Sequence, residues 1–181
     1  MTEPTNKLAV VKTPESDNAR TLSLRAVVAE DEPFLFEVYA STRNEELAAW
    51  GWDAAQQEGF LRMQFLAQGR SYGTDDEQTS HQIILLDERP AGRLVVTRTE
   101  SYIRLTDIAL LGPYRGSGIG TALIKELIEE ADAGGLPLRL HVLKTNLGAK
   151  RLYERLGFRL SGESGMHLKL ERLPRAATEI A

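Results

Sequence analysis

Hydrophobic and polar residues follow two periods along this chain, and together they predict a sheet with helices. Short alternating or continuous apolar runs predict strands, and apolar residues three and four positions apart predict helices. Asp53 is expected to cap the second helix and Gly69 to end it. The predicted strands span residues 21–28, 82–86, 93–99, 103–111, 137–143, 158–163 and 165–173, and the predicted helices span 30–42, 53–69, 118–133 and 146–157.

The order of these elements indicates an α/β (α+β) fold. An antiparallel meander leads into a strand–helix–strand unit, so we expect a mixed, mostly antiparallel central sheet of about seven strands flanked by about four helices. Residues 21–173 are expected to form one domain, between a flexible N-terminal tail at 1–20 and a C-terminal tail at 174–181. The first twenty residues contain no apolar stretch of the length found in signal peptides.

The predicted strand 103–111 loses its alternation part-way. Ile103 and Leu105 are apolar at odd positions, whereas every residue of the run after Asp107 is apolar. A β-bulge near Thr106 and Asp107 produces such a break, and so does burial of the strand on both faces. The sequence leaves both explanations open.

Composition excludes several classes of function. The 181 residues include no cysteine, which excludes a disulfide framework, a cysteine-ligated zinc and a cysteine nucleophile, and is typical of a cytoplasmic protein. The net charge of −4 argues against a nucleic-acid partner. No segment has the length of a transmembrane helix, so no membrane partner is expected. The three histidines lack metal-ligand spacing, and no metal is expected.

A glycine-rich loop follows the strand 103–111. Arg115 is followed by Gly116, Gly118 and Gly120, and a helical pattern begins at once. Glycine is a poor helix former, but its missing side chain lets a ligand approach the backbone. The first N–H groups of a helix lack partners and attract anions. The loop therefore predicts a phosphate site, with tight strand–helix packing as the alternative.

The spacing of the glycines selects the kind of phosphate ligand. The chain has no GxxxxGK[ST] string, and its glycines do not fit GxGxxG, so neither nucleoside triphosphates nor dinucleotides are favoured. The loop does match R-x-x-G-x-G, from Arg115 to Gly120. This string resembles the pyrophosphate-binding motif of the GNAT superfamily of acetyl-CoA-dependent N-acetyltransferases.

A second block carries the same resemblance. The stretch "NLGAKRLYERLGF" is similar to the second cofactor motif of that superfamily, with Asn146 and Tyr153 in the places of its Asn and Tyr. Seven residues is nearly two helical turns, so both side chains point the same way. The resemblance covers residues 21 to about 173 and implies the GNAT fold. One departure is that many relatives carry proline where this chain has Gly112, with Pro113 next.

The resemblance implies acetyl-CoA as the acetyl donor and CoA as the product. It places the pyrophosphate on backbone N–H groups of the loop, beside the fixed charge of Arg115, and the pantetheine arm along the end of strand 103–111. Strands 105–111 and 138–143 would splay apart to make room. The implied cofactor-binding residues are Leu110, Leu111, Arg115, Gly116, Ser117, Gly118, Ile119, Gly120, Thr121, Asn146, Ala149 and Tyr153.

The implied reaction is direct transfer of the acetyl group to an amine. The backbone N–H of Leu110 would face the thioester carbonyl, and Tyr153 would protonate the departing thiolate. Direct transfer is preferred to an acyl-enzyme because there is no cysteine and no serine with an evident histidine partner. The candidate bases are Asp107, Glu45 and Glu46, or water relayed through them. The alternative for each of the three is a solvated carboxylate on the surface without a catalytic role.

The acceptor half of the chain carries weaker signals. Arg43, Trp52 and Gln64 are the candidates to line the acceptor pocket, and an arginine there suits an acceptor with a carboxylate, such as an amino acid. A small molecule or amino acid is favoured over a peptide or protein. His141 is expected to be a hydrogen-bonded core histidine. A homodimer is a further expectation, since dimers are common among relatives.

Two other functions fit the cofactor motifs. One is a non-catalytic module that binds acetyl-CoA or CoA as a sensor or as part of an assembly. The other is an enzyme that uses a longer acyl-CoA. Tyr153 favours catalysis over the module, because binding alone needs no acid.

Overall fold

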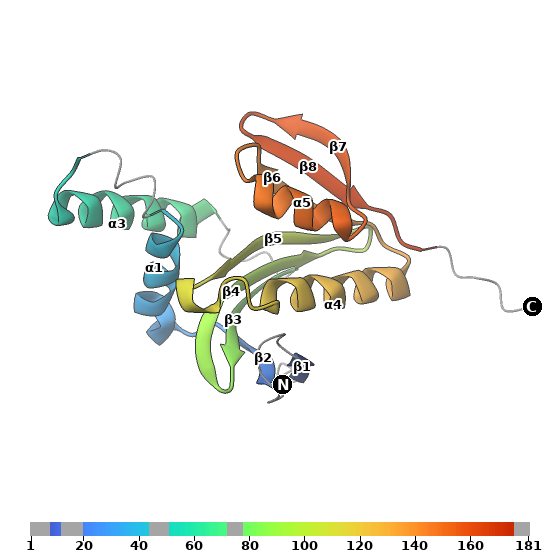
Figure 1. Cartoon of the computed structure of the whole chain (residues 1–181), viewed down its shortest axis with the longest axis horizontal. Coiled ribbons are helices and arrows are strands. Elements are labelled where there is room, and N and C mark those ends of the chain that lie inside the picture. The colour runs from blue at the N-terminus through green and yellow to red at the C-terminus, as the bar shows by residue number, and fades with distance from the viewer. Residues whose placement is uncertain (1–7, 12–19, 44–50, 72–77, 176–181) are drawn as a thin grey trace, which may run out of the picture.

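One twisted sheet forms the frame of the molecule (Figure 1). The computed structural model describes residues 8–11, 20–43, 51–71 and 78–175. Within that part, eight strands pair in the order β1-β2-β3-β4-β5-β6-β8-β7, and every pair is antiparallel except β5 with β6. The strands are β1 (Leu8–Val11), β2 (Arg20–Ala26), β3 (Thr79–Leu86), β4 (Arg89–Arg98), β5 (Ile103–Leu110), β6 (Leu138–Leu143), β7 (Arg159–Ser164) and β8 (His167–Arg172).

All seven predicted strands are present, and the mixed, mostly antiparallel sheet is confirmed. The eighth strand, β1, lies inside the segment 1–20 that was expected to be a flexible tail, and it pairs with β2 at the edge of the sheet. That expectation is therefore wrong for Leu8–Val11. A four-residue apolar run is too short to show a period, so the sequence pattern did not distinguish it from a tail.

Four α-helices lie in the described residues, as expected. They are α1 (Glu32–Ser41), α3 (Ala54–Ser71), α4 (Ile119–Gly134) and α5 (Leu147–Arg155), with short 3-10 turns at Ala29–Asp31 and Gly112–Tyr114. Asp53 caps α3, since its Oδ1 accepts from the N–H of Gln56 at 2.9 Å. The helix continues past Gly69 to Ser71, so its predicted end was two residues short.

The helices cover both faces of the sheet. The main core joins α4 and α5 to the strands, and it includes Leu94 on β4 and Phe158 just after α5. The segment 91–96 of β4 is buried on both faces, and α1 contacts β4 and β5. A strand that is buried on both faces must be covered by other elements on both sides of the sheet. Strand β5 therefore runs through the middle of the molecule, with its end directed at the start of α4 (Figure 1).

Strand β5 contains the bulge that its sequence predicted. Val95 of β4 pairs with Asp107 and Val96 pairs with Leu105, so Thr106 has no partner across the ladder. The extra residue at position 106 explains the change of phase, and burial on both faces adds to the apolar run, since Ala109 is only 8% exposed.

Strands β5 and β6 also splay apart as predicted. Their parallel ladder covers only Ile103–Leu105 with Leu138–Leu140, although β5 continues to Leu110 and β6 to Leu143. Beyond the last pair, the two strands leave a gap shaped like a V. The closed end of this V lies at Leu105, and its open end lies beside the glycine-rich loop.

Candidate active site

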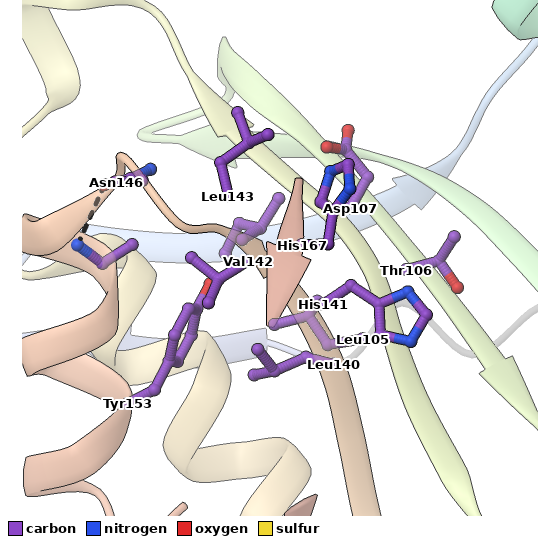
Figure 2. A pocket seen from close by; sticks show the side chains of 12 residues that line it. Leu105, Thr106, Asp107, Leu140, His141, Val142, Leu143, Asn146, Tyr153 and His167 are labelled. Atoms are coloured by element: carbon purple, nitrogen blue, oxygen red, sulfur yellow. Dashed lines mark hydrogen bonds between the residues drawn. The ribbon is translucent and has the colours of Figure 1, made fainter. Parts of the chain in front are cut away.

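A cavity of about 590 Å³ fills the gap between β5 and β6 (Figure 2). Helix α5 closes one side of it and the end of β8 borders another. Because the gap passes between two strands, its walls carry residues from both faces of the sheet. The lining residues are Leu105, Thr106, Asp107, Ile108, Leu140, His141, Val142, Leu143, Asn146, Ala149, Tyr153 and His167.

The glycine-rich loop presents unused backbone donors beside this cavity. Gly116 and Gly118 have φ of 73° and 85°, a region that other residues rarely adopt, and open space lies where their side chains would be. In the described part of the chain, the backbone N–H groups from Gly116 to Thr121 donate to no protein acceptor. The first α4 N–H that is used belongs to Ala122, which donates to the Gly118 oxygen at 3.0 Å. Such a row of free donors at a helix start binds anions.

The side chain of Arg115 does not face this row of donors. Its Nε donates to the oxygen of Leu110 at 2.8 Å, and its Nη2 donates to the oxygen and Oγ of Ser41, both at 3.0 Å. Its backbone N–H donates to Gly112 at 3.1 Å. The expectation that Arg115 offers its charge and its N–H to the pyrophosphate is therefore corrected: Arg115 ties the loop to the end of β5 and to the end of α1.

The end of β5 offers two further donors to the cavity. The N–H of Leu111 donates to the Ala91 oxygen at 2.9 Å, so it is not available to a cofactor. Because N–H groups alternate along an antiparallel strand, those of Leu110 and Ile108 point away from β4, towards the gap. Leu110 thus lies as the sequence predicted. Ile108 was missed, because its direction depends on the pairing register with β4.

Tyr153 reaches the cavity from α5. The residue is 8% exposed, and its ring packs edge-on against Phe158 with centroids 5.7 Å apart. Burial, together with the nearby charge of Asp107, raises the pKa of Tyr153 to about 12. No hydrogen bond from a described residue occupies its hydroxyl, which points into the cavity (Figure 2). The group is thus a protonated donor at neutral pH.

Asn146 begins α5 and lines the cavity with Ala149. Its Oδ1 accepts from the backbone N–H of Ala149 at 3.1 Å, which makes Asn146 the N-cap of the helix (Figure 2). The carbonyl half of the side chain is therefore used by the fold, and the amide NH₂ is the half that remains for a ligand.

The candidate proton acceptors differ in their surroundings. The carboxylate of Asp107 accepts from Nε of Arg93 at 2.6 Å, and Arg93 is only 8% exposed. His141 is exposed on the cavity wall, so the expectation of a core histidine is wrong. Partial burial and the charges of Arg104, Lys169 and His167 lower the pKa of His141, which favours its neutral form. Glu45 and Glu46 lie outside the described residues.

The residues expected to line the acceptor pocket do not line this cavity. The hydroxyl of Tyr39 donates to Oε1 of Gln64 at 3.0 Å, which joins α1 to α3. The guanidinium of Arg43 lies 5.3 Å from the Tyr39 ring, and Trp52 packs edge-on against Phe60. Gln64 therefore joins α1 to α3, whereas Arg43 contacts a ring of α1 and Trp52 contacts a ring of α3. The polar wall is instead supplied by Thr106, His141 and His167, which the sequence analysis did not assign.

The described residues contain neither a metal-binding cluster nor a membrane-spanning helix. No group of three or more His, Cys, Asp or Glu side chains there is arranged to hold a metal ion. None of the helices there is long and apolar enough to span a bilayer.

Residues 32–158 match the family model described as the acetyltransferase (GNAT) family. The chain belongs to the GNAT acetyltransferase family. The structure of a PaiA N-acetyltransferase from Thermoplasma acidophilum in complex with coenzyme A shares this GNAT fold, with a TM-score of 0.63 at 18% identity over 84% of this chain and 98% of that one. The ribosomal-protein-S18-alanine N-acetyltransferase of Escherichia coli gives a TM-score of 0.59 at 19% identity, over 88% of this chain and 98% of the other.

A curated relative of this GNAT domain is the thialysine N-epsilon-acetyltransferase of Sus scrofa, 44% identical over 73 residues. The match covers 39% of this chain and 43% of that enzyme, so it spans less than half of either. GNAT acetyltransferases use acetyl-CoA, and the geometry fits that cofactor. The free donors of the glycine-rich loop suit a pyrophosphate, and the adjoining cavity is deep enough for a narrow chain ending at Tyr153.

Proposed function

We propose that this chain transfers the acetyl group of acetyl-CoA directly to the primary amine of a small acceptor. One observation carries the proposal. The N–H of Ile108 and the hydroxyl of Tyr153 lie on the cavity in the gap between β5 and β6, and the N–H of Leu110 and the free donors of the glycine-rich loop follow where β5 ends. A protein that only stored the cofactor would not need a donor at the reacting end of that gap.

The residues divide the work of the reaction among them. The loop from Gly116 to Thr121 holds the pyrophosphate of the donor. The N–H groups of Ile108 and Leu110 stabilise negative charge on the thioester oxygen, and a single preorganised donor of this kind supplies ~3 kcal/mol. As the carbon–sulfur bond breaks and the carbon–nitrogen bond forms, Tyr153 donates its hydrogen bond to the sulfur that leaves.

The amine must be neutral before it attacks. Its proton passes to His141, to Asp107 or to water between them, since both side chains line the cavity on the wall away from α5. His141 fits this role better, because Asp107 is already held by Arg93. The proton released on acylation leaves by the same route, and the sulfur takes a proton to become the thiol of CoA.

The acceptor is proposed to be a small amine or amino acid. The curated relative that shares 44% identity over its matched segment acts on thialysine, an amino acid. The polar wall formed by Thr106, His141 and His167 suits a small polar molecule. We also propose one domain over residues 21–173, to which β1 adds an edge strand, a cytoplasmic location and a homodimer. Sedimentation velocity on the full chain measures the oligomeric state.

The test is a turnover screen with the full chain. Release of CoA from acetyl-CoA is followed across amines, diamines, amino acids and peptides, with Tyr153→Phe in parallel. We expect turnover with small amines and a large loss in the variant. Tight binding of acetyl-CoA without turnover of any amine would identify a sensor module instead, and the absence of CoA binding to folded protein would refute both functions. Propionyl-CoA and butyryl-CoA in the same assay report on longer acyl donors.

A further inference from the structure

A group of cationic side chains without carboxylate partners lies at the closed end of the V between β5 and β6. Arg104 and Lys169 are its permanent charges, and His141 and His167 lie beside them. In the described part of the chain neither Arg104 nor Lys169 takes part in an ion pair, although the protein as a whole carries a net charge of −4. We call these four side chains the basic cluster.

The pairing register places the basic cluster on one face of the sheet. Arg104 of β5 pairs with Arg139 of β6, and His141, two residues further along β6, points to the same face. His141 in turn pairs with Lys169 of β8, and His167 lies two residues from Lys169. The three strands therefore present the cluster on the face of the sheet that carries His141 and His167, and these two residues line the cavity.

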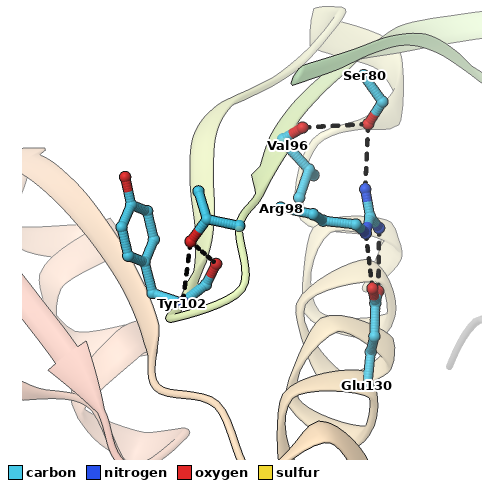
Figure 3. A network of polar contacts seen from close by, with 6 residues as sticks. Ser80, Val96, Arg98, Tyr102 and Glu130 are labelled. Carbon is cyan, nitrogen blue, oxygen red and sulfur yellow. Dashed lines mark hydrogen bonds and ion pairs between the residues drawn. The ribbon is translucent and has the colours of Figure 1, made fainter. Parts of the chain in front are cut away.

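Arg104 is held in place but its charge is not neutralised. Its Nε is buried without a hydrogen-bond partner, and its guanidinium carbon lies 5.1 Å from the centre of the Tyr102 ring. The backbone of Tyr102 is fixed by Thr99, whose Oγ1 accepts from its N–H and donates to its oxygen, both at 3.0 Å (Figure 3). A buried donor without an acceptor is costly unless a ligand supplies one.

Neighbouring arginines show the contrast. The guanidinium of Arg139 contacts the same Tyr102 ring, at 4.8 Å from its centre, but Arg139 also pairs with Glu171 at 2.7 Å. Arg93 pairs with Asp107, and Arg98 holds the carboxylate of Glu130 with two nitrogens at 2.6 and 2.9 Å (Figure 3). The fold supplies carboxylates for these cations, whereas no carboxylate of the described residues pairs with Arg104 or Lys169.

We propose that Arg104 and Lys169 bind a carboxylate of the acceptor, so that the acceptor is an amine that also carries an acid group. This inference rests on the proposed acetyl transfer and names the class of acceptor. A guanidinium and an ammonium on one face of the sheet form charge-assisted hydrogen bonds with a carboxylate, which would meet Arg104 at its terminal nitrogens.

The spacing along β5 selects among such amines. The reacting centre lies at Ile108 or beyond, and Arg104 is four residues earlier, which at the rise of a strand is roughly 10–13 Å between the two backbones. Side chains shorten that span but do not remove it. The amine and the carboxylate must therefore be several bonds apart, as in an ω-amino acid, and not on one carbon as in an α-amino group.

The test compares acceptors that differ only in charge or spacing. Turnover of the full chain with acetyl-CoA is measured for 6-aminohexanoate, for its neutral amide and for norleucine. The proteins are wild type, Arg104→Gln, Lys169→Gln and the control Arg89→Gln, which removes an exposed charge at the start of β4. We expect kcat/KM for 6-aminohexanoate to exceed those of the other two by ~10-fold or more, and both cluster variants, but not the control, to remove that advantage. Equal values for the acid and its amide in wild type, or a preference that survives both variants, would overturn the proposal.

A binding measurement separates this proposal from the proposed reaction. Calorimetry on the CoA-loaded chain compares 6-acetamidohexanoate with its amide. Tighter binding of the acid that is lost in Lys169→Gln, an exposed position with little effect on folding, supports the carboxylate site even if no amine is turned over. Turnover without any preference for the acid, in contrast, leaves the acetyltransferase standing and refutes the site. Melting temperatures of each variant show whether Arg104→Gln still folds.

Discussion

Replacing Tyr153 with phenylalanine removes one hydroxyl from the end of the cavity and leaves the ring in place. The ring keeps its edge-on contact with Phe158, so the variant should fold. The change is therefore a test of what the hydroxyl does and not of how α5 packs.

The raised pKa of Tyr153 sets the size of the expected effect. A pKa of about 12 lies about 3.5 units above that of an ordinary thiol near 8.5, so complete transfer of the proton to the thiolate is uphill by ~5 kcal/mol. We therefore expect Tyr153 to act as a hydrogen-bond donor to the sulfur. A hydrogen bond to a charged group is worth ~1.5–3 kcal/mol, which corresponds to a fall in kcat of roughly 10- to 150-fold.

The assay is steady-state release of CoA at saturating amine, from pH 6 to pH 10. We expect kcat to fall as stated, KM for acetyl-CoA to change little, and wild type to show no loss of rate from ionisation of Tyr153 within this range. Tyr39→Phe is the matched control, because it removes a buried tyrosine hydroxyl that bonds Gln64 away from the cavity. If kcat of the wild type declined above about pH 9 and this decline were absent from the pH profile of Tyr153→Phe, the raised pKa of Tyr153 would be refuted. A fall of less than 3-fold would refute the role of the donor.

Three further predictions concern the frame and the polar wall. Gly92→Ala places a methyl group against the backbone oxygen of Ala109 and 3.0 Å from the Cα of Leu110, so both kcat and the melting temperature should fall. Gly59→Ala is the control, because open space surrounds this position, and it should be neutral or stabilising. Equal effects of the two changes would contradict this reasoning. The Arg172 guanidinium holds the pKa of Asp132 below its usual range, so this pair stabilises the fold above pH ~4, and its contribution is lost as pH falls through the lowered pKa. Asp132→Asn should lower the free energy of unfolding in urea by ~3 kcal/mol at pH 7 and by less at pH 3. An equal loss at both pH values would count against this reasoning. His141→Gln should lower kcat/KM for the amine most below pH 8, where the ammonium form dominates, with KM for acetyl-CoA unchanged; a uniform loss at every pH would assign His141 to binding alone.

The parts of the site that depend on local patterns could be predicted from the sequence. The glycine loop, the helix after it and the helix with Tyr153 follow from spacings of three, four and seven residues. The broken alternation near Thr106 located the bulge, because an extra residue leaves a visible mark on a period of two. The structure of these features depends on residues that are close to one another in the sequence.

The parts that depend on pairing between distant strands could not be predicted. The direction of the Ile108 N–H follows from the register with β4, and the basic cluster assembles from β5, β6 and β8. The partner of Arg115 is Ser41, 74 residues away, so its side chain turned from the expected phosphate to the end of α1. No local period contains such information.

The single residue inserted at Thr106 divides β5 into two segments of opposite phase. Ahead of it, Ile103 and Leu105 face the helix-covered core from odd positions; behind it, Ile108 and Leu110 do so from even ones. What matters at position 106 is thus the presence of a residue more than its identity. Exchange of Thr106 for another β-former would preserve the bulge. Deletion of Thr106 would make Leu105 and Asp107 neighbours on the partners they already have, so later residues would keep their faces and β5 would lose the bulge and the bend that comes with it. The extra residue at position 106 should accordingly matter for the course of β5 beside the gap, and not for which face its later residues occupy.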